Sequence, residues 1–99
     1  TIKILDTVRH IPVENILYLE AVGYRHTLRM HLTDELLEFN SSLEHFSRQL
    51  GKNFWRCHRS FLVNRSHIHT VHLKEQIVEL DNGETCLLSR KAKSEYRTE

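Results

Sequence analysis

The sequence is poor in cysteine, and its two cysteines stand outside any familiar metal or redox motif. Cys57 and Cys86 are the only ones among 99 residues, and neither belongs to a Cys-x-x-Cys pair. Two cysteines cannot form the dense disulfide framework of a small secreted domain. The cysteine content therefore predicts a reduced, cytoplasmic protein.

Long hydrophobic runs, internal repeats and flexible linkers are also missing. A membrane-spanning helix needs about 20 apolar residues, and the runs here are far shorter, so no membrane partner is expected. A hydrophobic content of 39% is too high for a disordered tail. At this length we expect one compact domain over residues 1–99, and its start at Thr1 rather than Met predicts a piece cut from a longer polypeptide.

Catalytic motifs are absent as well. The sequence holds no P-loop, no Gly-x-Ser-x-Gly and no His-Glu-x-x-His, so we expect neither an enzyme nor a cofactor. His67 and His69 share one face of an expected strand, which is a spacing that metal sites use. His72 has the opposite parity, however, and no carboxylate or Cys-x-x-Cys flanks the pair. We therefore expect no metal site.

Charge of one sign is not in excess, because 14 Lys and Arg face 13 Asp and Glu and leave a net charge of +1. Taken whole, this balance argues against a strongly basic nucleic-acid-binding domain. The positions of the charges point the other way. Residues 45–74 hold six Lys or Arg and no acid, residues 21–33 are also free of acids, and residues 90–97 hold four bases and one acid. A charge run usually just solvates a surface, but three such runs brought together would form a face suited to phosphates.

What is present is mostly the short-period patterning of β-strands. Within residues 24–32, Leu28, Met30 and Leu32 share one face, whereas Arg29 and His31 share the other. Short apolar and aromatic runs recur along the rest of the chain. We expect strands at residues 16–21, 24–32, 35–40, 54–57, 61–64, 68–73, 76–80 and 85–88.

One segment has the punctuation of an α-helix. Ser41 and Glu44 fit a capping box, and Gly51 stands where a C-terminal cap would. The spacing predicts a helix over residues 42–50, the only one that the sequence marks clearly.

Two turns are also marked. Gly23 separates the first two strands, and Asn82-Gly83 predicts a two-residue hairpin turn because both residue types tolerate positive φ. The tail from Arg90 stays open between a loop and a short helix. The fold class predicted is mainly β with one packed α-helix.

A run in the middle of the chain carries a resemblance to a known family. Phe54-Trp55-Arg56-Cys57-His58-Arg59-Ser60-Phe61-Leu62-Val63-Asn64 resembles the aromatic-x-Arg-x-His-x-Ser-aromatic-aliphatic-Val-Asn signature of the LytTR family of bacterial DNA-binding domains. The segment 11–21 is similar to that family's opening strands, and the later elements come in the expected order. The resemblance covers nearly the whole chain. It implies an elongated, multi-sheet β fold with one short packed α-helix.

The resemblance also implies how DNA is read. Loops rather than a recognition helix would enter the major groove of double-stranded DNA, from the turn before the second strand, the turn after the signature histidine and the segment after the last hairpin. Arginine and histidine suit base reading because both can donate to guanine O6 and N7. His58 is open between a DNA contact and a structural role, and Arg90 and Lys91 are alternatives for the third base reader. The implied DNA-binding residues are Arg25, His26, His58, Arg59, Ser60, Ser89, Arg90, Lys91 and Lys93.

The placement of the cysteines is most similar to response regulators of Gram-positive peptide quorum-sensing systems, of the accessory-gene-regulator or competence type. This implies the output domain of a two-component transcription regulator whose phosphoacceptor receiver domain is absent from the sequence. A sensor kinase would act through that receiver. Family members bind imperfect direct repeats, which implies a dimer on DNA.

Two further interpretations stay open. Cysteine is often an inert core residue, but Arg56, His58 and Arg59 surround Cys57 with positive charge that would favour its thiolate. Cys57 and Cys86 are therefore a candidate redox pair whose disulfide would distort the reading loops. The competing function is a β-rich protein-interaction, ligand-sensing or redox-sensing module with a basic partner-binding face.

Overall fold

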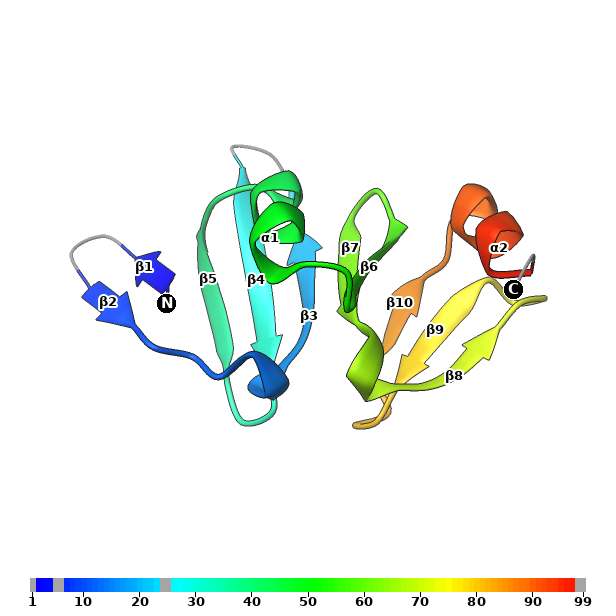
Figure 1. Ribbon diagram of the computed structural model, residues 1–99, viewed down its shortest axis with the longest axis horizontal. Helices are drawn as coiled ribbons and strands as arrows, with labels where there is room; N and C mark the ends of the chain where they lie inside the picture. Colours follow the sequence, from blue (N-terminus) through cyan, green and yellow to red (C-terminus); the bar gives the residue numbers. More distant parts are fainter. Residues whose placement is uncertain (1, 5–6, 24–25, 98–99) are drawn as a thin grey trace.

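The computed structural model describes residues 2–4, 7–23 and 26–97 and is an elongated molecule of 43 × 25 × 21 Å. A two-stranded hairpin, a five-stranded sheet and a three-stranded sheet follow one another along its long axis (Figure 1). This arrangement confirms the mainly β, multi-sheet fold that the sequence predicts. In chain order the elements are β1 (Ile2–Ile4), β2 (Thr7–Arg9), η1 (Val13–Asn15), β3 (Ile16–Ala21), β4 (Thr27–Leu32), β5 (Leu36–Asn40), α1 (Leu43–Leu50), β6 (Phe54–His58), β7 (Phe61–Asn64), η2 (Arg65–His67), β8 (Ile68–His72), β9 (Ile77–Leu80), β10 (Thr85–Leu87) and α2 (Arg90–Arg97).

The central sheet has the strand order β5-β4-β3-β7-β6, and all of its neighbouring strands are antiparallel. Successive residues of a strand point to opposite faces, and both faces are buried at the middle of this sheet. Leu19 and Leu62 enter a first core, whereas Tyr18 and Val63 enter a second core. Burial on both faces explains why β3 and β7 are nearly continuous apolar runs.

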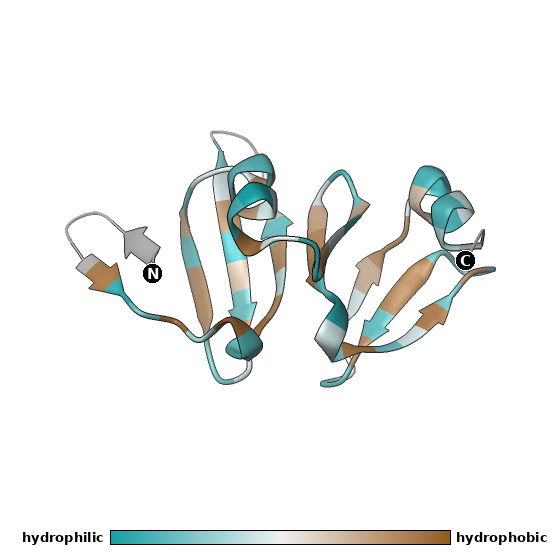
Figure 2. Cartoon of the chain, in the orientation of Figure 1, coloured by the Kyte–Doolittle hydropathy of each residue, from teal (hydrophilic) through white to brown (hydrophobic). Residues whose placement is uncertain are grey.

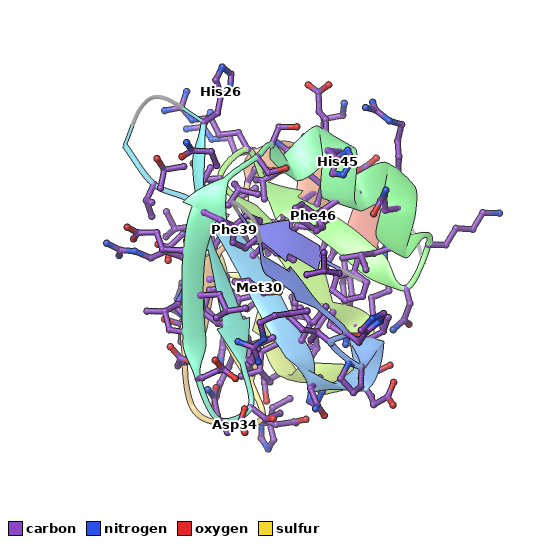
Figure 3. The ribbon with its side chains drawn as sticks, turned by 90° about the vertical axis from the view of Figure 1, so that its left-hand side faces the viewer. His26, Met30, Asp34, Phe39, His45 and Phe46 are labelled. Atoms are coloured by element: carbon purple, nitrogen blue, oxygen red, sulfur yellow. The ribbon has the colours of Figure 1, made fainter. Side chains whose placement is uncertain are left out.

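The first core lies between the central sheet and α1. Leu28, Met30 and Leu32 are buried in it, as their alternation predicts. Phe39 of β5 meets Phe46 of α1 edge to face, with ring centroids 5.7 Å apart, and Met30 lies below them (Figure 3). This contact fixes α1 against the sheet.

The second core lies between the other face of the central sheet, the sheet β10-β9-β8 and α2. Trp55 of β6, Val78 of β9 and Ala92 of α2 are all buried in it. Hydrophobic residues lie mainly on the strands, while both helices are largely hydrophilic (Figure 2). Neither α1 nor α2, the two α-helices of the described residues, has the length and apolar character that crossing a bilayer requires.

The start of α1 differs from the prediction. The side chain of Ser42, rather than that of Ser41, caps the helix by accepting a hydrogen bond of 3.1 Å from the His45 N–H. The helix therefore begins at Leu43, and the predicted capping box is wrong. Gly51 ends the helix with a φ of 81°, as predicted.

Several strand boundaries differ by one residue, and one strand and one turn differ by more. β4 begins at Thr27 rather than at residue 24. The Leu80 N–H donates to the Glu84 carbonyl, so the hairpin turn holds three residues, of which Gly83 has a φ of 89°, and the predicted two-residue turn is wrong. The tail, which the sequence left open between a loop and a short helix, forms the helix α2.

Candidate nucleic-acid interface

The three predicted loop regions lie along one long edge of the molecule. The start of β4, the turn between β6 and β7 and the start of α2 all lie at the upper edge in Figure 1. His26 lies at this edge, and Asp34 lies at the opposite one (Figure 3). We call the edge that carries His26, Arg59 and Lys91 the basic edge.

The first region is held by a backbone hydrogen bond to the approach of α1. His26 has a φ of 55°, a left-handed conformation that few residues other than glycine adopt. Its carbonyl accepts a hydrogen bond of 2.7 Å from the Ser41 N–H, and its side chain is exposed. Arg25, the other predicted residue here, lies outside the described residues.

The second region is a tight turn. His58 pairs with Phe61, so Arg59 and Ser60 form a two-residue connection that we call the 59–60 turn. The Ser60 N–H donates to His58 Nδ1 at 3.0 Å. Burial, and then the charges of Arg59 and Arg56, lower the pKa of His58. The ring is therefore neutral at neutral pH, and the bond suits the structural role that the sequence left open.

Arg56 also holds this turn, and the sequence did not mark it as a site residue. Its Nε donates to the His58 carbonyl at 3.2 Å, and its Nη2 donates to the Arg59 carbonyl at 2.7 Å. The signal that could have found it is an arginine on an exposed strand position, a few residues before a tight turn. Only the structure shows that its guanidinium bends back onto the backbone.

The third region begins at Ser89. Its Oγ accepts a hydrogen bond of 3.1 Å from the Ala92 N–H and so caps α2. Its own N–H donates to the Cys57 carbonyl at 2.8 Å. Arg90 and Lys91, which follow in the first turn of the helix, are both exposed.

Backbone hydrogen bonds connect the second region with both of the others. The Ala21 N–H, at the end of β3, donates to the Ser60 carbonyl at 2.9 Å. The bond from Ser89 to Cys57 makes the corresponding connection on the α2 side. The spacing of the three regions is therefore set by main-chain contacts rather than by side chains alone.

Two hollows lie between the three regions. The first, of about 400 Å³, is lined by His26 and Arg59, and the second, of about 470 Å³, is lined by Arg59, Ser89 and Lys91. The two hollows share Arg56 and Arg59, and together we call these hollows the furrow. His26, Arg59 and Lys91, which are far apart in the chain, all line it, and Arg59 belongs to both hollows.

The furrow is not purely basic, and some predicted residues lie outside it. Glu44 lines the first hollow and Glu95 lines the second. Arg90 and Lys93 line neither of these two hollows. Of the two alternatives for the third region, Lys91 is therefore the one that shares a hollow with Arg59.

Other bases of the acid-free runs have local partners. Arg29 forms an ion pair of 2.8 Å with Glu38 on the neighbouring strand. Arg65 lies over the Trp55 ring, 5.1 Å from its centroid.

The turns β4–β5 and β9–β10 lie at the opposite edge (Figure 1). They carry the acidic residues Asp34, Glu35, Asp81 and Glu84. The segregation of charge along the chain thus becomes a partial segregation in space, because Glu44 and Glu95 still lie at the basic edge.

The cysteines do not behave as their sequence neighbours suggest. Cys57 and Cys86 are free, fully buried and part of the second core. Burial raises the pKa of Cys57 to about 12, and Arg56 only partly opposes it, so of the two open interpretations the structure favours the inert core residue over the thiolate. Burial raises the pKa of Cys86 as well. Charges beside Cys57 in sequence point along the surface, whereas its Sγ points inward to the Leu87 carbonyl at 3.3 Å.

The candidate metal histidines have carboxylate partners. His67 Nδ1 lies 3.2 Å from an Asp81 oxygen, whereas Glu79 lies near both His69 and His72, with N···O distances of 4.0 and 2.9 Å. The carboxylates missing from the flanking sequence thus come from β9 and the turn after it. Within the part of the chain that the structure describes, no group of three or more His, Cys, Asp or Glu could hold a metal ion.

Comparison with known proteins identifies the family. The profile of the family described as LytTr DNA-binding domain matches residues 6–98. The chain is a LytTR domain. Accessory gene regulator protein A of Staphylococcus epidermidis is 36% identical, and that of Staphylococcus aureus 38%, each over 80 residues that make up 81% of this chain and 33% of the relative. This LytTR domain thus spans about a third of the length of the curated relatives it matches.

The solved structures agree. The LytTr DNA-binding domain of a methyl-accepting/DNA response regulator from Bacillus cereus superposes with a TM-score of 0.79 and 29% identity, over 97% of this chain and 90% of that one. The LytTR domain described here therefore binds DNA and belongs to the machinery of transcription regulation.

Proposed function

We propose that this LytTR domain recognises a specific sequence of double-stranded DNA with side chains that enter the major groove from the basic edge. The observation that carries this proposal is the gathering of His26, Arg59 and Lys91 around two adjoining hollows. Arginine and lysine donate to guanine O6 and N7, and histidine can donate there too. Ser60 and Lys93 would contact phosphates, which set register without reading sequence.

We further propose that the domain is the output module of a two-component transcriptional regulator in the cytoplasm that responds to peptide quorum sensing. The similarity to proteins named accessory gene regulator protein A, of which the matched region makes up only 33%, supports this context. A receiver domain outside this sequence would accept the signal of a sensor kinase. Two copies would bind imperfect direct repeats as a dimer. The domain itself would carry out no catalysis.

Selection from a random duplex pool tests base recognition, followed by titration of the selected and a scrambled duplex at fixed salt. We expect His26→Ala to cost about 1–3 kcal/mol on the selected duplex and much less on the scrambled one. Lys93→Ala should weaken both duplexes similarly and reduce the salt slope by about 1. Equal losses on both duplexes for His26→Ala would remove His26 from base reading, and a pool without enrichment would reject sequence recognition.

A steep fall of duplex affinity with salt, together with a sequence preference, would favour this proposal over a β-rich protein-interaction module. Duplex affinity that depends on phosphate contacts falls steeply with salt. The net charge of +1 predicts weak non-specific binding and a large share of affinity from base contacts. Specificity should therefore survive at salt concentrations that strip a merely basic protein from DNA.

The two buried thiols carry a second, separate proposal, a disulfide that switches DNA binding off. Its support is that Cys57 and Cys86 share one core and that Cys57 precedes His58 and the 59–60 turn. The raised pKa of Cys57 predicts slow oxidation of the native protein. Peroxide treatment followed by duplex titration and mass spectrometry, with Cys86→Ser as the control, tests it. Unchanged affinity in a sample that has formed the bridge would reject it.

A further inference from the structure

The 59–60 turn has a backbone conformation that is uncommon for a two-residue hairpin loop. Two-residue hairpin loops prefer type I′ or II′ turns, in which at least the first central residue has positive φ. Among the described residues other than glycine, positive φ occurs only at His26 and Gln76, so neither Arg59 nor Ser60 adopts it. The turn therefore lacks the twist that normally matches the flanking strands, and contacts from outside must hold it.

Those contacts come from two side chains of β6. Arg56 forms a fork whose Nε and Nη2 donate to the carbonyls of His58 and Arg59. His58 Nδ1 accepts from the Ser60 N–H, which only the neutral ring can do. The two bonds from the Arg56 guanidinium are charge-assisted, and such bonds are roughly twice as strong as neutral ones. Together they fix the backbone on both sides of the Arg59 side chain.

We propose that Arg56 is a positioning residue which, together with a neutral His58 ring, holds the 59–60 turn so that the Arg59 side chain is presented to a base edge. This inference rests on the proposed function, in which Arg59 reads DNA. Arg56 then acts through Arg59 rather than as a phosphate contact of its own. The exposed position of Arg56 at the furrow makes the phosphate contact the natural rival explanation.

The charged groups around His58 decide how its ionisation can be isolated. Arg56 and Arg59 flank it on its own hairpin, and Lys91 and Glu95 of α2 line the hollow opposite. Protonation of any group at the basic edge would strengthen phosphate binding generally. The ratio of affinities for selected and scrambled duplex removes that common part. His58→Asn keeps an oxygen acceptor near the Nδ1 position but cannot titrate.

The first experiment compares Arg56→Lys, Arg56→Met and Arg59→Ala on the selected and scrambled duplexes. Lysine keeps the charge but loses the fork, so we expect Arg56→Lys to lose about tenfold on the selected duplex and little on the scrambled one. In the Arg59→Ala background, Arg56→Lys should add almost nothing, because both act through one contact. Retained selectivity in Arg56→Lys, with losses on both duplexes and a reduced salt slope in Arg56→Met, would overturn the positioning role.

The second experiment begins with the DNA-free protein, and this first part does not depend on the proposed function. Amide hydrogen exchange of Ser60 should be faster in Arg56→Lys than in the wild type, and ¹⁵N shifts should show an unprotonated His58 Nδ1. As the pH falls through the titration of His58, the wild type should lose discrimination between duplexes, and His58→Asn should lose less. Superimposable pH profiles of duplex discrimination in the wild type and His58→Asn, or unchanged Ser60 exchange in Arg56→Lys, would overturn the proposal that Arg56 and His58 brace the 59–60 turn. A wild type that discriminates no duplex would instead overturn the proposed function, whatever Ser60 shows.

Discussion

The two ends of the β6–β7 hairpin use polar side chains in opposite ways. At one end Asn64, which is 1% exposed, donates to the Ile16 carbonyl at 2.9 Å and accepts from the Asn53 amide at 2.8 Å and the Ser66 N–H at 3.0 Å. These groups satisfy one another. At the other end the bonds run to the backbone of the 59–60 turn and leave the side chain of Arg59 at the furrow. One end is thus built for stability and the other for presenting a side chain to a ligand.

The largest effect is expected from a substitution at the Asn64 end of the β6–β7 hairpin. Asn64→Ala removes the donor of the buried Ile16 carbonyl and the acceptor of Asn53 and Ser66. Leaving buried polar groups without partners should lower the free energy of unfolding by about 2–4 kcal/mol. Urea unfolding measures it. The folded fraction should bind duplex as the wild type does, and a loss of duplex selectivity without a loss of stability would contradict the division between the two ends.

A substitution at the other end of the hairpin, in the 59–60 turn, should affect duplex affinity and not stability. Arg59→Ala should cost about 1–3 kcal/mol on the selected duplex, while the unfolding free energy should shift by less than about 0.5 kcal/mol, because the side chain is exposed. Arg9→Ala is the matched control, since it removes the same charge from a residue that pairs with Glu35 away from the basic edge. Equal losses of duplex affinity in the two variants would show that only net charge matters.

This division explains which features the sequence could predict. Most of the strands, the Gly51 cap of α1 and the buried face of β4 follow from local patterns, since alternation and capping are properties of a few adjacent residues. The acid-free runs correctly indicated the basic edge, because turns at one end of antiparallel strands meet at one edge of the sheet. Arg29 and Arg65 were exceptions, because pairing of Arg29 with Glu38 is a matter of strand register and Arg65 lies over the Trp55 ring.

Features that depend on where a side chain bends could not be predicted. The charges beside Cys57 in the sequence do not make it a thiolate, because neighbours in a strand point to opposite faces, so Arg56 is exposed while Cys57 is buried. The brace by Arg56 and the cap by Ser42 instead of Ser41 have the same origin. The Arg59 carbonyl accepts a hydrogen bond from Arg56, and the Ser41 N–H donates to the His26 carbonyl. Sequence order identifies neither pairing.

A smaller effect is expected where the opposite edge connects the two sheets. The Tyr18 hydroxyl donates to Glu84 in the β9–β10 turn at 3.1 Å, and its ring stacks on His31 with centroids 4.0 Å apart. Tyr18→Phe keeps the stacking and removes the bond, so we expect a loss of about 1 kcal/mol in unfolding free energy. Duplex affinity should not change. A loss of affinity would mean that this contact also sets the position of the basic edge.

The smallest effect concerns the surface ion pair of the opposite edge. Two hydrogen bonds from Arg9, of 2.9 and 2.8 Å, lower the pKa of Glu35 below its ordinary value of 4.5. A lowered pKa gives stability that is present above pH 4.5 and is lost as the pH falls through the lowered value. The melting temperature of the wild type should therefore fall slightly more steeply with acid than that of Glu35→Gln. In an Arg9→Ala background the two slopes should coincide, and a persisting difference would assign the acid sensitivity to another partner of Glu35. Because both side chains are exposed, the effect should stay near the limit of detection, in contrast to the buried contacts of Asn64.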